Sequence, residues 1–206
     1  AEKNPAADVE GHDACRKICI LSALAFGKHV YPEQVKTEGI TEITLDDVEY
    51  ADNFGYVIKL IGHAKMLENG KITADVSPTL VSRDCILSSV DGVFNCIMVN
   101  GDQTGEVAFY GKGAGKEATA SAVVADIMDC IKHIEARKYL FWEDGDSEYV
   151  DADYDFYGKQ YVIVKSDDFD SLNTQFVSIF PSCTQVIKNE FAKEIAFITE
   201  EDFESN

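Results

Sequence analysis

Apolar residues recur with a helical period near the start of the chain. One stripe has the spacing i, i+4, i+7 and i+11 and consists of Ala14, Ile18, Leu21 and Ala25. That spacing places the stripe on one face of an amphipathic helix, which Gly27 can end. A shorter helix is expected over residues 45–55, because acidic residues at its start suit the positive end of a helix dipole and Gly55 suits its C-terminal end.

Strand-like segments and turns alternate through the middle of the chain. Residues 56–67 and 72–81 are rich in apolar and β-branched side chains, and Asn69-Gly70 between them is a strong hairpin signal. Residues 90–102 and 104–115 predict two more strands. Together these segments predict an antiparallel sheet that the first helix faces.

The second half of the chain predicts a long helix and a small closing unit. Residues 116–137 carry apolar positions with helical spacing, and the acidic residues at 143–155 indicate a linker or exposed loop. A strand, a helix and two more strands are then expected at residues 159–166, 169–180, 183–189 and 194–203. The predicted fold class is α+β, with a mixed or antiparallel sheet faced by helices and a small α+β domain after it.

Charge and composition narrow the classes of partner. The 206-residue chain has a net charge of −19. Such an acidic surface would repel a phosphate backbone, so nucleic acid is not expected as a partner. No apolar run reaches the roughly 18 residues that span a bilayer, so no membrane partner is expected.

Cysteine and histidine usage gives no sign of a metal site. Cys15 and Cys19 lie one helical turn apart, but no second pair has the spacing of a zinc site, so no metal is expected. We interpret the six cysteines as reduced and mostly buried, which is typical of a cytoplasmic protein.

Two groups of residues have the composition of a chemical site. In the first, Asp13 and Lys17 lie four positions apart and share a helix face, with Asp8 and Glu10 just before them. An exposed ion pair of little energetic weight would explain this spacing. If the pair faces a cleft instead, the carboxylate fixes the lysine, which can then donate a proton or bind a substrate oxygen.

The second group is a glycine-rich turn, Gly111, Gly113 and Gly115, between a predicted strand and helix. Glycines there let the backbone approach a ligand, and the helix N-terminus favours negative charge. A tight turn that begins the helix would explain the same residues. The pattern fits neither a P-loop nor the G-x-G-x-x-G dinucleotide fingerprint.

Several segments together resemble the homoserine dehydrogenase family. The first contains an Asp-x-x-Gly-x-Asp-x-x-x-Lys core formed by Asp8, Gly11, Asp13 and Lys17. Further matching blocks follow in the family's order at residues 37–44, 46–65, 74–81, 89–102 and 105–127. The resemblance covers about residues 1 to 130.

The resemblance implies an enzyme that reduces L-aspartate 4-semialdehyde to L-homoserine, on the route to threonine and methionine. By position, Lys17 resembles the family's proton-donating lysine and Asp13 the carboxylate that holds substrate beside it. Glu2 resembles the glutamate that binds the homoserine amino group, and Asp8 another substrate-side carboxylate. These charges suit a substrate that carries an ammonium group.

The resemblance also implies NADP or NAD as cofactor. Gly113, with Gly111 and Gly115 around it, resembles the glycine turn that touches the nicotinamide. The family binds most of the cofactor through an N-terminal nucleotide-binding domain, which also supplies a second lysine. Neither is found in this sequence, so we expect a fragment that is inactive alone.

The resemblance divides the chain into three parts. We expect a catalytic and substrate-binding domain at residues 1–136, an acidic linker at 137–155 and a degenerate ACT-like domain at 156–206. In the last part the Asp-Arg-Pro-Gly turn of such domains is replaced by residues 168–171, Asp-Phe-Asp-Ser, so we expect a packing or dimerising role and not threonine binding. The expected partners are the small-molecule substrate and a second copy of the chain in a homodimer.

An alternative from another class stays open. The chain would then be a non-catalytic amino-acid-sensing or scaffold protein that keeps an old enzyme core. A nucleotide-binding domain encoded upstream in the same reading frame favours the enzyme, and its absence there favours the alternative.

Overall fold

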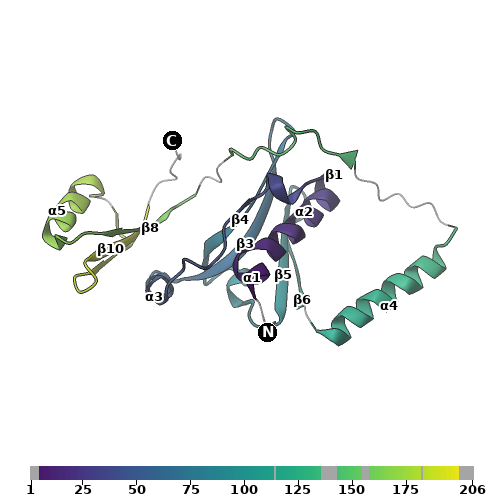
Figure 1. Ribbon diagram of the computed structural model, residues 1–206, viewed down its shortest axis with the longest axis horizontal. Coiled ribbons are helices and arrows are strands. Elements are labelled where there is room, and N and C mark those ends of the chain that lie inside the picture. The colour runs from purple at the N-terminus through teal and green to yellow at the C-terminus, as the bar shows by residue number, and fades with distance from the viewer. Residues whose placement is uncertain (1–4, 114, 136–142, 155–157, 182, 200–206) are drawn as a thin grey trace. The chain divides into compact units, whose positions relative to one another are not determined.

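The computed structural model describes residues 5–113, 115–135, 143–154, 158–181 and 183–199. Helices and several small sheets make up the described chain, which confirms the predicted α+β class (Figure 1). The chain divides into one compact unit of residues 1–80 and 142–206 and a second of residues 81–141. The first unit is therefore discontinuous in sequence.

The first unit contains a small three-stranded sheet with helices around it. Up to β4 its elements are α1 (Ala6–Val9), α2 (His12–Phe26), β1 (Lys28–His29), η1 (Pro32–Gln34), β2 (Lys36–Thr37), α3 (Leu45–Asn53), β3 (Tyr56–Met66) and β4 (Ile72–Ser82). The strand order is β2–β4–β3, and β2 runs parallel to β4. The predicted hairpin between β3 and β4 is confirmed, with the Leu67 N–H donating to the Lys71 carbonyl at 2.8 Å.

Helix α2 packs against this sheet, as its apolar stripe predicts (Figure 1). The core that they share contains Cys15, Ile18, Cys19, Ile72, Ala74 and Val76. Helix and strand approach closely, because a Cβ placed on Gly62 in β3 would lie 3.2 Å from the Cβ of Ile18. Gly27 ends α2 with a φ of 84°, as expected.

Thr44 begins α3 through a reciprocal pair of hydrogen bonds. The Asp47 N–H donates to Thr44 Oγ1 at 3.2 Å, and the Thr44 N–H donates to Asp47 Oδ2 at 2.7 Å. Such a capping box satisfies backbone donors that the first turn of a helix leaves without partners. The helix predicted over residues 45–55 is therefore confirmed.

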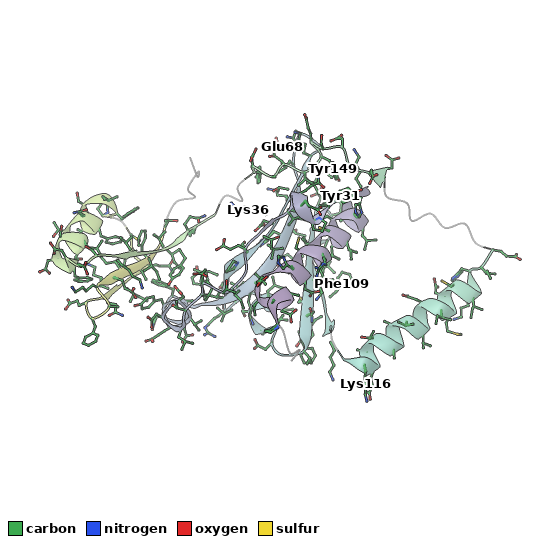
Figure 2. The ribbon with its side chains drawn as sticks, viewed as in Figure 1. Tyr31, Lys36, Glu68, Phe109, Lys116 and Tyr149 are labelled. Atoms are coloured by element: carbon green, nitrogen blue, oxygen red, sulfur yellow. The ribbon has the colours of Figure 1, made fainter. Side chains whose placement is uncertain are left out.

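The acidic segment from residue 143 onward belongs to the first unit and pairs with its strand β1. Strand β7 (Glu143–Asp144) pairs parallel with β1. Tyr149 and Val150 are buried in the α2 core, and Ile72 exchanges backbone hydrogen bonds with Tyr149 and Asp151 at 2.9 and 2.8 Å (Figure 2). The described part of this segment is therefore not the exposed loop that was expected. Burial of two apolar side chains, Tyr149 and Val150, stabilises its contact with the core even though acidic residues surround them.

The chain ends in the predicted strand–helix–strand–strand unit. Its elements are β8 (Tyr161–Lys165), α5 (Phe169–Ile179), β9 (Val186–Asn189) and β10 (Glu194–Ile198). The strand order is β8–β10–β9, with both pairs antiparallel. Helix α5 packs on this sheet through Phe176, whose ring lies 4.9 Å from that of Phe197.

The second unit contains a hairpin and a long helix. Its elements are η2 (Ile86–Ser89), β5 (Phe94–Gly101), β6 (Gly105–Lys112) and α4 (Lys116–Lys132). Strands β5 and β6 pair antiparallel in a two-stranded sheet of their own. The predicted hairpin of these two strands is confirmed, and the prediction that they share one antiparallel sheet with β3 and β4 stays a prediction, because that sheet would span the two units.

Candidate functional site

A sharp corner between α1 and α2 places the candidate carboxylates. Gly11 precedes α2 with φ 82° and ψ 2°, a left-handed conformation that glycine adopts without steric cost. Its N–H donates to the Asp8 carbonyl at 3.2 Å, and its own carbonyl accepts from the Cys15 N–H at 2.9 Å. Asp8 therefore stands in α1 and Asp13 in the first turn of α2, on either side of one tight corner.

Asp13 and Lys17 form the expected ion pair. The Lys17 Nζ lies 2.7 Å from Asp13 Oδ2, and the two side chains are 57% and 43% exposed. A pair that solvent reaches this freely contributes little to stability. The contact places an ammonium group beside a carboxylate at the surface of the first unit.

A contact between a histidine and a carboxylate lies just before this pair in the sequence, and sequence reasoning missed its histidine. His12 Nε2 lies 3.2 Å from Glu10 Oε2, and both side chains are about half exposed. The signal was present, because His12 stands inside the Asp-x-x-Gly-x-Asp core. Glu2, the remaining candidate of this group, lies outside the described residues.

The glycine turn belongs to the second unit and has a structural explanation at its centre. A Cβ on Gly113 would collide with the side-chain amide of Asn95, and the Gly113 N–H already donates to the Val93 carbonyl at 3.0 Å. Gly111 and Gly115 differ from Gly113 in this respect, because a Cβ on either would meet nothing within 4 Å. Those two positions face open space.

A group of shifts in pKa occurs away from these candidates, between α3 and the C-terminal sheet. Glu194 is 1% exposed, and its pKa is lowered because hydrogen bonds from Lys165 and Tyr50 outweigh the effect of burial, which raises it. Burial, together with a hydrogen bond to Asp47, raises the pKa of Tyr161. Each group in this network has a structural partner, so the shifts do not indicate a second active site.

The cysteines are partly as expected. All six are free, but among them only Cys15 and Cys19 are buried, so the prediction that most are buried is wrong. Burial raises the pKa of the Cys19 thiol to about 12, which keeps it neutral and unreactive at physiological pH. Across the described residues, no group of three or more histidine, cysteine or acidic side chains could hold a metal ion. No described helix combines the length and apolarity needed to cross a membrane.

Comparison with known proteins decides the family. The family model for homoserine dehydrogenase matches residues 1–128, which is more than half of the chain. This chain belongs to the homoserine dehydrogenase family. The match includes the α1–α2 corner and the glycine turn, and it ends within α4.

Individual homoserine dehydrogenases agree with that assignment. The enzyme of Pseudomonas aeruginosa is 47% identical over 132 residues, which are 64% of this chain and 30% of that protein. A crystal structure of S. aureus homoserine dehydrogenase aligns with 100% of this chain and 51% of its own, at 35% identity and a TM-score of 0.77. A hyperthermophilic archaeal homoserine dehydrogenase, solved in complex with NADPH, aligns with 68% of this chain and 37% of its own, at 30% identity and a TM-score of 0.51. The chain thus spans about a third of the length of the curated relatives that it matches.

Proposed function

We propose that this chain supplies the substrate-binding and catalytic part of an NAD(P)-dependent homoserine dehydrogenase, which reduces L-aspartate 4-semialdehyde to L-homoserine. The observation that carries the proposal is the Asp13–Lys17 ion pair at 2.7 Å, held at the start of α2 inside the family's motif. Because the chain spans only part of its relatives, the activity is proposed for the protein in which this part works with a nucleotide-binding domain.

The bound nicotinamide would supply the hydride that reaches the aldehyde carbon. Negative charge then develops on the aldehyde oxygen, and the Lys17 ammonium stabilises that oxygen and donates a proton to it. Asp13 keeps the ammonium in place through the ion pair at 2.7 Å. Asp8, and Glu2 outside the described residues, bind the ammonium group of the substrate by charge complementarity.

Gly111, Gly113 and Gly115 are proposed to contact the nicotinamide of NADP or NAD, most of which a nucleotide-binding domain would hold. The open space beside Gly111 and Gly115 supports this role. The archaeal relative was solved with NADPH, which supports the class of cofactor. Gly113 would contribute indirectly, by allowing Asn95 to pack against the turn.

The exposure of the ion pair has a consequence for catalysis. A lysine in open solvent stabilises an oxyanion weakly, because water screens the charge. We therefore propose that another part of the protein covers this face during turnover, and that the 206-residue chain alone is inactive.

Oxidation of homoserine, followed by NAD(P)H absorbance, tests the function. The protein would be this chain fused behind the nucleotide-binding domain of the Pseudomonas aeruginosa relative, with the chain alone for comparison. Turnover by the fusion that Lys17→Ala abolishes, and that Lys71→Ala at another exposed ion pair leaves intact, supports the proposal. Near-normal turnover in Lys17→Ala would overturn the assignment.

The same experiment addresses the alternative of an amino-acid sensor or scaffold. A fusion without turnover, combined with saturable binding of an amino acid to the chain alone, would favour that class. The proposed domain division remains residues 1–136, 137–155 and 156–206, although Tyr149 and Val150 join the core of the first part. A cytoplasmic location and a homodimer are proposed with the enzyme.

The C-terminal unit is proposed to be ACT-like and to serve in packing. Its α5 begins with an Asp168 side chain that accepts from the Ser171 N–H at 3.0 Å, so ordinary helix capping explains the altered turn. Calorimetry with threonine is expected to give no saturable heat. Saturable binding at micromolar concentration would contradict the packing role.

A further inference from the structure

Residues 37–40 form a strap that connects β4 to the α1–α2 corner. The strap follows β2, whose first residue is Lys36 (Figure 2). On one side, the Glu38 N–H donates to the Val76 carbonyl of β4 at 2.8 Å. Two residues later, the Ile40 N–H donates to the Val9 carbonyl of α1, also at 2.8 Å. The strap therefore links the end of α1 to the sheet through backbone hydrogen bonds on both sides.

Gly39, in the middle of the strap, touches the backbone of the corner. A Cβ at this position would collide with the Val9 carbonyl oxygen and would lie 2.6 Å from Glu10 Cα. The φ of Gly39 is not positive, so conformational freedom is not what requires glycine here. What requires it is the absence of space, and the neighbouring atoms belong to the main chain, which cannot swing away as a side-chain tip can.

The other side of the corner also lies near the strap, with a little more space. A Cβ on Gly11 would lie 3.1 Å from Thr37 Cγ2 and 3.3 Å from Val76 Cγ1. The four residues of α1 include no buried side chain, so no core packing anchors that helix. Backbone contact with Gly39 and Ile40 therefore helps to fix α1, and with it Asp8, beside the hydrogen bond from the Gly11 N–H to the Asp8 carbonyl.

We propose that Gly39 is a positioning residue that, through Val9 and Glu10, sets the place of the Asp8 carboxylate relative to α2. The inference rests on the proposed function, because it assumes that Asp8 binds the substrate ammonium. A side chain at position 39 pushes the corner away from β4. The carboxylate then moves relative to Asp13 and Lys17, whose helix the sheet holds independently through Ile18.

Steady-state kinetics of the active fusion test this role. Gly39→Ala is expected to raise KM for homoserine about tenfold or more, since a displacement of about 1 Å at a substrate contact has effects of this size. Gly158→Ala is the matched control, because a Cβ there meets nothing within 4 Å and its φ is not positive. A glycine that mattered only for folding would reduce the active fraction, which lowers apparent kcat and leaves KM unchanged.

A double-mutant cycle with Asp8→Asn shows whether the effect of Gly39→Ala on KM acts through Asp8 or arises elsewhere. If Gly39 acts through Asp8, Gly39→Ala adds less than about threefold to KM in the Asp8→Asn background. A wild-type KM in Gly39→Ala, or equal effects in both backgrounds, would overturn the inference. Should Gly39→Ala fail to fold, Thr37→Ser decides, because it removes only the methyl group against Gly11 and keeps the Thr37 hydroxyl bond to the Val35 carbonyl.

Thr37→Ser is expected to raise KM about two- to fivefold, and a wild-type KM in that variant would also overturn the inference. Lys17→Ala keeps this outcome distinct from failure of the proposed function. If Lys17→Ala abolishes turnover while Gly39→Ala and Thr37→Ser behave as wild type, the enzyme assignment stands and only the positioning role is lost.

Discussion

The hydroxyl of Tyr50 donates to Glu194 Oε1 at 2.6 Å, across 144 positions of sequence. Both residues are nearly inaccessible to solvent, at 5% and 1% exposure. The same carboxylate accepts from Lys165 Nζ at 2.7 Å on its other oxygen, and Asn189 Nδ2 donates to the Tyr50 hydroxyl at 2.7 Å. A buried charge with several good partners therefore joins α3 to the C-terminal sheet, and removal of one partner leaves the others unsatisfied.

Tyr50→Phe tests how much the contact between Tyr50 and Glu194 contributes to stability. The substitution removes a hydrogen bond to a buried carboxylate and is expected to lower the free energy of unfolding by about 1–3 kcal/mol. Urea unfolding followed by circular dichroism measures the change. Tyr56→Phe, a partly exposed position outside this network, is the matched control and should change stability by under about 0.5 kcal/mol. Equal effects of the two substitutions would contradict the junction.

Acid should weaken the same junction. Since the pKa of Glu194 lies below its ordinary value of 4.5, its charge stabilises the fold above that pH, and the contribution is lost as the pH falls through the lowered pKa. We expect Glu194→Gln to be less stable than wild type at pH 7 but to lose less stability as the pH falls from 7 to 3. Chemical unfolding at each pH gives the free energy of unfolding as a function of pH for both proteins. The same dependence on pH in wild type and variant would contradict the role of Glu194.

Two glycines that flank α2 offer a matched comparison. Gly11 and Gly27 have nearly the same φ, 82° and 84°, so alanine costs a similar backbone strain of about 1–2 kcal/mol at each. Only at Gly11 does the added methyl also meet Thr37 and Val76. Gly11→Ala should therefore destabilise the protein by about 1 kcal/mol more than Gly27→Ala in thermal or urea unfolding. Equal losses would show that the corner is loosely packed.

Lys17 should matter for turnover and hardly for folding. Because its ion pair is about half exposed, Lys17→Ala is expected to change the free energy of unfolding by less than about 0.5 kcal/mol. In the fusion, the same variant should reduce kcat by at least about a hundredfold. Lys71→Ala provides the comparison, with similarly small effects on stability and normal turnover. A large loss of stability in Lys17→Ala would point to a structural role instead.

Local patterns predicted most elements of this chain, and the reasons are visible in its residues. The stripe through Ile18 predicts α2 and its buried face, and Asn69-Gly70 predicts the β3–β4 hairpin. The turn at residues 100–102 likewise predicts the β5–β6 hairpin, but the tertiary partner of a hairpin is not encoded in its turn. Burial of Tyr149 was missed because the surrounding acidic residues dominate the composition of that segment.

The candidate site shows the same limit. The motif singled out Asp8, Asp13 and Lys17, and the spacing of Asp13 and Lys17 on one helix already places those two side chains together. Gly39 carries no local signal of its role, because its need for glycine arises from Val9 and Glu10, which lie far from it in sequence. The contact between Tyr50 and Glu194 likewise becomes evident only when two distant elements pack.

The return of the chain through Tyr149 and Val150 affects the order in which the molecule can fold during synthesis. A ribosome would complete residues 81–141 before it releases the strand that pairs with Ile72 and closes the first core. The β5–β6 hairpin can thus form while the part that precedes it is still open. A product truncated at residue 136 would carry the whole family motif and yet have a gap in its interior, and it should be prone to aggregate and to be degraded.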